Sequence, residues 1–176
     1  QWDAKAHAEL MMAEWGFGAI SFERERTFNL YAKIEDHAND VHDYLKYLKF
    51  GYGRATDDAS MEIRHGRMSR EEGQAMVARH DAREPVSLDF YCEFLGVPKQ
   101  EFYDLVAPMR DKAFWREAGG GWEALDSVAR QAPGAAENAA RVPPSPDRTL
   151  DPANRHLYFN PALPPPPTGE AALDIA

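Results

Sequence analysis

Hydrophobic residues recur at intervals of three and four over most of the first 110 positions, which is the pattern of amphipathic helices packed on a core. The longest run of this pattern, from Phe28 to Phe50, predicts the main helix. Shorter runs are bounded by capping residues, glycines and prolines, which mark where helices begin and end. They predict helices over residues 4–15, 57–65, 70–80, 88–95 and 98–109.

Capping signals set the expected helix ends. Asp3 is a plausible N-cap for the first helix, which Gly16 would end, and Thr56 is expected to cap the helix over residues 57–65. Ser69 and Glu72 form a capping box ahead of the helix over residues 70–80, and Gly96 is expected to close the helix over residues 88–95. Residues 20–26 are expected to form an extended or irregular connector, and an aromatic hairpin is expected around residues 114–122. The predicted fold is therefore mainly α.

Composition changes after about residue 132. Ten of the thirteen prolines lie from Pro133 onward, including Pro164–Pro167. A proline-rich segment of this kind predicts a disordered or loosely docked tail with polyproline character, with a role as a proline-motif ligand as the alternative. We therefore expect a helical domain over residues 1–132 and a tail over residues 133–176.

Length, charge and cysteine content limit the possible functions. A chain of 176 residues is long enough for one domain with its own core. Cys92 is the only cysteine, so this chain can build neither an internal disulfide nor a cysteine-based zinc site. No apolar run approaches the roughly 20 residues of a membrane span, and a net charge of −9 argues against a nucleic-acid surface. These features predict a cytoplasmic protein that binds neither membrane nor nucleic acid.

The segment over residues 94–106 has the rhythm of a helix-turn-helix motif, with a glycine turn between two short helices. A DNA-binding motif would carry a basic face, whereas Glu101 and Asp104 are offset here only by Lys99. We interpret the segment as packing.

A glycine-punctuated turn after the main helix carries most of the candidate chemistry. Gly51 and Gly53 allow the backbone there to take positive φ and to approach a ligand with no Cβ in the way. Lys49 and Arg54 stand on either side of this turn. Two cations beside a helix N-terminus suit a phosphate or a sugar carboxylate.

The carboxylates that follow the turn have two interpretations. Asp57 and Asp58 lie in the expected first turn of the next helix, where the helix dipole favours negative charge. They are either part of a ligand site or the caps of an ordinary helical corner. Arg64 and His65 either reach back toward the same site or interact with the C-terminal end of the helix dipole.

Three carboxylates on one face of the main helix, with two histidines nearby, raise a metal hypothesis. The histidines are five positions apart, which is about 140° around a helix, so they cannot both join one compact site. A solvated acidic face is the alternative. The residues concerned are Asp36, Asp40, Asp43, His37 and His42.

Three motifs read together point to a known family. They are K-F-G-Y-G-R-A-T-D-D-A-S at Lys49–Ser60, E-I-R-H-G at Glu62–Gly66 and M-S-R-E-E at Met68–Glu72. With them the chain resembles the C-terminal portion of the N-acetyl sugar amidotransferases of bacterial surface-polysaccharide biosynthesis, which belong to the PP-loop ATP pyrophosphatase superfamily. The resemblance covers roughly residues 1–125.

The resemblance implies ATP-dependent conversion of an acetamido group on a nucleotide-linked sugar into an acetamidino group, for lipopolysaccharide, O-antigen or related glycans. Adenylation of the amide oxygen would release pyrophosphate, and ammonia from a separate glutaminase partner would displace AMP. The family's S-G-G-x-D-S nucleotide loop and its paired cysteines are absent from this sequence. We therefore expect a helical half that completes an α/β PP-loop half not present here, with ATP and Mg²⁺ used by the full-length parent and neither bound tightly by this chain alone.

The resemblance also implies roles for the residues of the turn. Lys49 and Arg54 would counter phosphate charge, while Gly51 and Gly53 would give backbone approach. Asp57 would hold Mg²⁺ or orient ammonia, and Asp58 ranks second to it for that role. Arg64 would bind a sugar carboxylate. Alanine at Lys49 or Arg54 is expected to abolish turnover in the parent without loss of the fold.

Two expectations concern the chain as a whole. It begins with Gln1, directly before a helical pattern, and we expect it to be a piece of a longer protein. The alternative to an enzyme fragment is a non-catalytic helical protein-interaction module that docks other proteins through its aromatic surfaces and proline-rich tail.

Overall fold

The computed structural model describes residues 3–36, 38–125 and 127–128, and this part of the chain is mainly helical, as predicted. The segment predicted as a proline-rich tail lies outside the described residues. In chain order the elements are α1 (Ala4–Trp15), α2 (Ala38–Phe50), α3 (Arg54–Arg64), α4 (Arg70–His80), α5 (Ser87–Leu95), α6 (Lys99–Val106), the 3-10 helix η1 (Ala107–Met109), β1 (Trp115–Ala118) and β2 (Gly121–Ala124).

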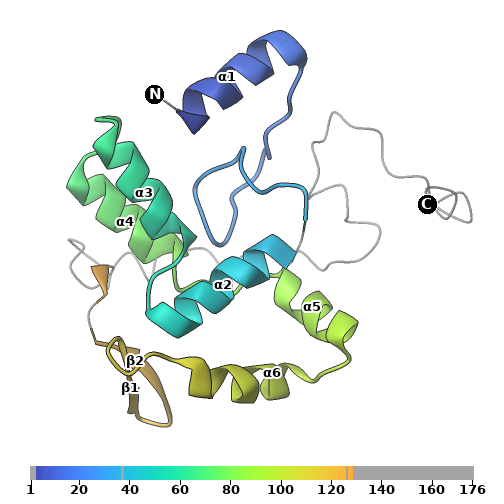
Figure 1. The fold of residues 1–176 in the computed structure, drawn as a ribbon, viewed down its shortest axis with the longest axis vertical. Helices are drawn as coiled ribbons and strands as arrows, with labels where there is room; N and C mark the ends of the chain where they lie inside the picture. The colour runs from blue at the N-terminus through green and yellow to red at the C-terminus, as the bar shows by residue number, and fades with distance from the viewer. Residues whose placement is uncertain (1–2, 37, 126, 129–176) are drawn as a thin grey trace, which may run out of the picture.

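Helix α2 runs through the middle of the molecule, with the α3–α4 pair on one side and α5 and α6 on the other (Figure 1). Helix α1 stands apart from the other helices and is joined to them by a long irregular loop (Figure 1). The strands β1 and β2 form an antiparallel hairpin. The main core cluster joins α2, α5 and α6, and its buried members are Val41, Tyr44, Leu48, Leu88, Cys92, Phe102 and Val106.

Local capping signals predicted several helix ends correctly. Asp3 accepts hydrogen bonds from the first turn of α1, and Gly16 ends that helix in the left-handed conformation. Ser69 and Glu72 form the predicted capping box of α4. Gly96 ends α5 with φ of 69°. In each case both partners lie within a few positions of one another in the sequence.

The prediction that the main helix begins at Phe28 is wrong, because α2 begins at Ala38. Side chains in the preceding loop compete for the backbone groups that a helix would use. Asn29 Oδ1 accepts from the backbone N–H groups of Tyr31 and Ala32, at 3.0 and 3.1 Å. Lys33 has φ of 52°, which is incompatible with a right-handed helix.

The buried Arg24 holds this loop in shape. Its guanidinium donates to the carbonyl oxygens of Asn29, Ala32 and Lys33, and it forms an ion pair of 2.9 Å with Asp40 on α2. Carbonyl groups that accept from Arg24 are not available for the i to i+4 backbone hydrogen bonds of an α-helix. The apolar spacing at Leu30 and Ile34 thus belongs to an irregular loop rather than to a helix.

Helix α3 starts earlier than predicted, and Thr56 is not its N-cap. The helix begins at Arg54, after Gly53. Asp81, which follows α4, accepts from the backbone N–H of Gly53 at 2.8 Å and from the hydroxyl of Thr56 at 2.5 Å. Its other oxygen lies 3.3 Å from the backbone nitrogen of Thr56. A carboxylate 25 positions away in the sequence therefore caps this helix.

Arg26 is fully buried and links the loop to α2 and to the end of α4. It donates to the carbonyl oxygens of His80, the last residue of α4, and of Arg83 beyond it. One nitrogen lies 3.5 Å from the carbonyl oxygen of Asp43 on α2. Its guanidinium also lies over the ring of Tyr44, 5.0 Å from the centroid. Burial lowers the pKa of Arg26, and the negative charge of Asp81 opposes that shift.

The metal hypothesis for the acidic face of α2 finds no support. Within the described residues no group of three or more His, Cys, Asp or Glu side chains is arranged to hold a metal ion. Asp40 is paired with Arg24, and Asp43 with Lys33 at 3.0 Å. His42 points to solvent, and His37 lies outside the described residues.

No helix in the part of the chain that the structure describes is long and apolar enough to cross a membrane.

Replacing Arg26 by Met removes the charge and keeps most of the side-chain stem. We expect a loss of about 3–5 kcal/mol in the free energy of unfolding, because Asp81 and three backbone carbonyl groups lose a buried partner. Urea denaturation measures the loss. Arg64→Met is the matched control, since Arg64 is exposed and its hydrogen bonds in the described part of the chain go to Ser60, one turn earlier in α3. Equal urea midpoints of unfolding for the two variants would contradict the assigned role of Arg26.

His80 predicts a pH dependence of stability. Its imidazole is buried, Nδ1 lies 3.1 Å from the carbonyl oxygen of Arg24, and burial lowers its pKa to about 4. Unfolded histidine titrates near 6.5, so the unfolded chain binds this proton first as the pH falls. Between pH 7.5 and 5 we expect the folded state to lose about 2 kcal/mol through His80.

Urea denaturation across that pH range tests the expectation. His80→Asn retains a donor close to Nδ1 and removes the titration, so its free energy of unfolding is expected to change less with pH than that of the wild type. Parallel curves for the two proteins would show that His80 does not titrate as assigned.

Candidate functional site

A pocket of about 410 Å³ lies between the N-terminal end of α1, the loop over residues 28–32 and one side of α3. Its walls combine aromatic and aliphatic side chains with three cations and three carboxylates. The apolar walls are Phe28, Leu30, Tyr31, Met61 and Met68, and the charged residues are Lys5, Arg54, Arg67, Asp3, Asp58 and Glu62. A concave surface of this kind, apolar with a few converging polar groups, is typical of a small-molecule site.

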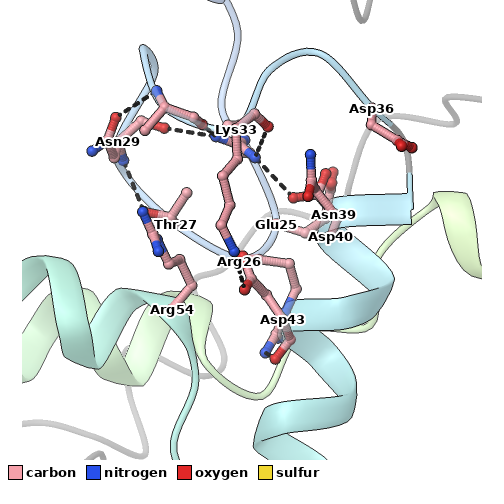
Figure 2. A network of polar contacts seen from close by, with 12 residues as sticks. Glu25, Arg26, Thr27, Asn29, Lys33, Asp36, Asn39, Asp40, Asp43 and Arg54 are labelled. Carbon is pink, nitrogen blue, oxygen red and sulfur yellow. Dashed lines mark hydrogen bonds and ion pairs between the residues drawn. The ribbon is translucent and has the colours of Figure 1, made fainter.

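Arg54 extends from the first turn of α3 toward the loop that carries Asn29 (Figure 2). Its Nε lies 3.4 Å from Asp58 Oδ2, one helical turn further along α3. The same Asp58 oxygen accepts a hydrogen bond of 2.5 Å from the Thr27 hydroxyl. Asp58 thus fixes the position of Arg54 and joins α3 to the loop.

The carboxyl group of Asp58, on the pocket wall, is buried. Burial raises its pKa, while the Thr27 hydrogen bond and the Arg54 charge lower it. A cation that approaches this wall would favour the ionised form, and an anion bound to Arg54 would favour the neutral form. The charge state of Asp58 is therefore sensitive to the charge of the ligand.

Arg67 closes another side of the pocket. Its guanidinium donates to both carboxylate oxygens of Glu62, each at 2.7 Å, and to Asp3 at 2.7 Å. These bonds lower the pKa of Glu62 and of Asp3. His65 lies 3.8 Å from the same Asp3 carboxylate. This ion-pair cluster attaches the start of α1 to the end of α3.

The irregular loop that forms the floor of the pocket is attached to α2 by two ion pairs. Figure 2 shows Lys33 and Asp43 directed toward one another, and their charged atoms are 3.0 Å apart. Arg24 binds the loop carbonyl oxygens and Asp40, as described above. Both supports end on α2, so the loop has a fixed position relative to the core.

The predicted glycine turn is not part of this pocket. Gly51 has the expected positive φ of 75°, whereas Gly53 is extended with φ of −120°. Asp81 occupies the position next to the α3 N-terminus where an external phosphate was expected. Gly53 has no room for a Cβ, which would lie 2.7 Å from Asp81 Oδ1 and 2.9 Å from Arg26 Nη2.

Lys49, Asp57 and Arg64, which were also predicted as site residues, do not line the pocket. Lys49 Nζ lies over the ring of Phe50, 5.2 Å from the centroid. Asp57 forms an ion pair of 2.5 Å with Lys46. Arg64 donates to the backbone and side chain of Ser60 on its own helix. Of the predicted cations and carboxylates, the structure brings Arg54 into the pocket together with Asp58, which the sequence favoured less than Asp57 as a site residue.

Several pocket residues had weak signals or none in the sequence. The spacing of Arg54 and Asp58, at i and i+4 on a helix, is a local signal for an ion pair. The contacts of Thr27 with Asp58 and of Asp3 with Arg67 join residues 31 and 64 positions apart, and no local pattern marks them.

A family model described as the C-terminal domain of WbpG-like lipopolysaccharide biosynthesis proteins matches residues 25–129, which is more than half of the chain. The chain belongs to this family. The match includes Arg54, Asp58 and Arg67 and leaves out the N-terminal helix α1. No curated protein matches the chain. WbpG-like proteins act in lipopolysaccharide biosynthesis, so the pocket belongs to a protein of that process.

In the WbpG-like domain, a substitution at Gly53 tests how closely Asp81 and Arg26 pack against the N-terminal end of α3. Gly53→Ala is expected to lower the free energy of unfolding by about 1–3 kcal/mol, because the added methyl group displaces Asp81 or Arg26. Thermal or urea denaturation gives the value. Gly121→Ala is the control, since the nearest atom to its Cβ would be 4.0 Å away; a Gly53 variant as stable as this control would contradict the close approach.

Proposed function

We propose that this chain is the helical part of an ATP-dependent amidotransferase of lipopolysaccharide biosynthesis that converts an N-acetyl group on a nucleotide-linked sugar into an acetamidino group. Membership of the WbpG-like family supports the process. The observation that carries the proposal is the pocket in which Arg54, held by Asp58, faces aromatic side chains. A cation beside apolar surface suits a sugar that carries phosphate or carboxylate.

The proposed reaction solves the problem that an amide oxygen is a poor leaving group. The amide oxygen attacks the α-phosphorus of ATP and pyrophosphate leaves. Ammonia then adds to the amide carbon, and AMP departs with the former amide oxygen. The product is an amidine, and the nucleotide-linked part of the sugar is unchanged. Ammonia would come from a glutaminase partner, and all of these components would meet in the cytoplasm.

We do not assign the ATP phosphates to this chain. Its sequence has no S-G-G-x-D-S loop, and Asp81 fills the space beside the glycine turn. An α/β PP-loop half would therefore hold ATP and Mg²⁺. The helical part would bind the sugar nucleotide and present its acetamido group to that half.

Within the pocket, Arg54 is proposed to bind the phosphate or carboxylate of the sugar nucleotide. Asp58 and Thr27 hold the guanidinium in place, which reduces the rotational freedom lost on binding. Tyr31 and Phe28 provide faces for the sugar or the base. The proposed roles of Lys49, Asp57 and Arg64 would need a second binding region, and Asp57 would have to leave Lys46 to reach Mg²⁺.

Two alanine variants distinguish the pocket from the glycine turn. In the protein with both halves, Arg54→Ala is expected to lower kcat/KM for the sugar nucleotide roughly 10- to 150-fold, since a charge-assisted hydrogen bond contributes about 1.5–3 kcal/mol. The assay follows AMP release with ATP, ammonium and a nucleotide-linked N-acetyl hexosamine. Arg70→Ala is the control for removal of an arginine, since Arg70 is exposed at the start of α4 and does not line the pocket.

Lys49→Ala decides between the two locations. Activity near wild type in Lys49→Ala, with loss in Arg54→Ala, places the sugar nucleotide in the pocket. Loss in Lys49→Ala alone would move the site to the glycine turn. Full activity in both variants, with both folded by circular dichroism, would rule out both assignments.

A non-catalytic interaction module remains the second candidate function, because α5 exposes a row of apolar side chains. Phe94 is 79% exposed, and Phe90 and Leu95 are exposed beside it. Monomeric proteins rarely leave large contiguous apolar patches uncovered. An absence of AMP release under all conditions above, with the fold intact, would favour this reading.

A further inference from the structure

A second cavity, of about 280 Å³, lies between the start of α2 and the exposed face of α5, away from the pocket that holds Arg54. The first turn of α5 lies beside the N-terminal end of α2 (Figure 1). We call this cavity the α5 groove. Half of its lining residues are aromatic, and the lining consists of Phe90, Tyr91, Phe94, Ala38, Asp36 and Ser87.

The Ser87 hydroxyl is a buried polar group in the lining of the groove. Ser87 is the first residue of α5, it is 2% exposed, and its hydroxyl oxygen has no hydrogen-bond partner within the part of the chain that the structure describes. A buried hydroxyl normally finds a partner, and leaving one unpaired costs about 1–3 kcal/mol. A hydroxyl can donate to a carbonyl oxygen, so a ligand with exposed carbonyl groups and apolar rings would complement this groove.

Consecutive prolines have this chemistry. Each proline presents an apolar ring and a carbonyl acceptor, and it has no backbone N–H that needs a partner. A proline run favours the polyproline II conformation before binding, so little conformational entropy is lost, and aromatic grooves bind such runs in other domains. The chain itself carries one at Pro164–Pro167. We infer that the α5 groove binds the Pro164–Pro167 segment of the same chain.

The length of the intervening chain allows this contact. Pro164 follows Val128, the last described residue, by 36 positions. A flexible chain of that length has a root-mean-square span of roughly 30–35 Å. A domain of this size has a radius of gyration of about 14 Å, so such a chain reaches across it. Tethering also raises the local concentration of the segment to about the millimolar range, which favours even weak docking.

The inference is independent of the proposed amidotransferase activity, because neither the groove nor the segment includes a residue of the Arg54 pocket. It accounts for the exposure of Phe94, which would be covered once the segment is bound. It also gives the proline-rich region a partner inside the same molecule rather than in another protein.

A paramagnetic label on the segment tests the contact in the full chain. Thr168→Cys places a nitroxide next to Pro167, and Cys92 is buried with a thiol pKa raised by burial, so labelling is selective. In ¹⁵N spectra of the full chain, amide signals of residues 87–95 are expected to lose at least half of their intensity. Signals of α3 are expected to keep theirs.

Matched variants identify the binding surface. Phe94→Ala is expected to restore most of the lost intensity, and replacement of Pro165 and Pro166 by Gly is expected to do the same. Leu105→Ala on α6 is the control, since Leu105 is 57% exposed and does not line the groove. Circular dichroism confirms that each variant keeps its helices.

Three results would overturn the inference. One is unchanged intensity over residues 87–95 in the labelled wild type. Another is a loss of intensity that Phe94→Ala leaves in place. The third is the same loss in a mixture of ¹⁵N-labelled chain with nitroxide-labelled unenriched chain, which would assign the groove to a second copy of the protein.

Discussion

The buried guanidinium of Arg26 is the interaction on which the arrangement of this domain depends. A fully buried cation is tolerated only when oxygen acceptors and negative charge surround it. Arg26 meets that condition through carbonyl groups at the end of α4, just after α4 and on α2, through the nearby charge of Asp81, and through the ring of Tyr44. Because these partners belong to different elements, placing Arg26 fixes the loop, α2 and the end of α4 relative to one another.

The candidate pocket follows from that arrangement. Its floor is the irregular loop, which Arg24 and Lys33 attach to α2, and its wall is α3, whose N-terminus is capped by Asp81. Arg54, which lines the pocket, is the first residue of this capped helix. The direction of Arg54 thus depends on a carboxylate that lies outside the pocket and is buried beside Arg26.

The sequence was sufficient for the helical class and for helix ends with local caps. Asp3, the Ser69–Glu72 box and Gly96 are recognisable because each cap and its helix are adjacent.

The start of α2 was predicted wrongly because the apolar period continued through residues whose carbonyl groups bind a buried arginine. The cap of α3 was missed because Asp81 lies beyond the next helix. Arg54 was predicted as a site residue from the glycine turn, and it lines a pocket whose other members, apart from Asp58 on the same helix, only the folded chain brings beside it.

The Asp81 cap also bears on the order in which the chain folds. Helices α3 and α4 are joined by a short turn, and the cap that closes them spans 25 to 28 positions. The bonds of Arg26 to the last residue of α4 and to the segment after it span 54 to 57 positions. Closing the shorter loop costs less chain entropy. The α3–α4 hairpin is therefore the natural early folding unit, and docking of the Arg26 loop, which completes the floor of the pocket, is a later step that needs the hairpin as its template.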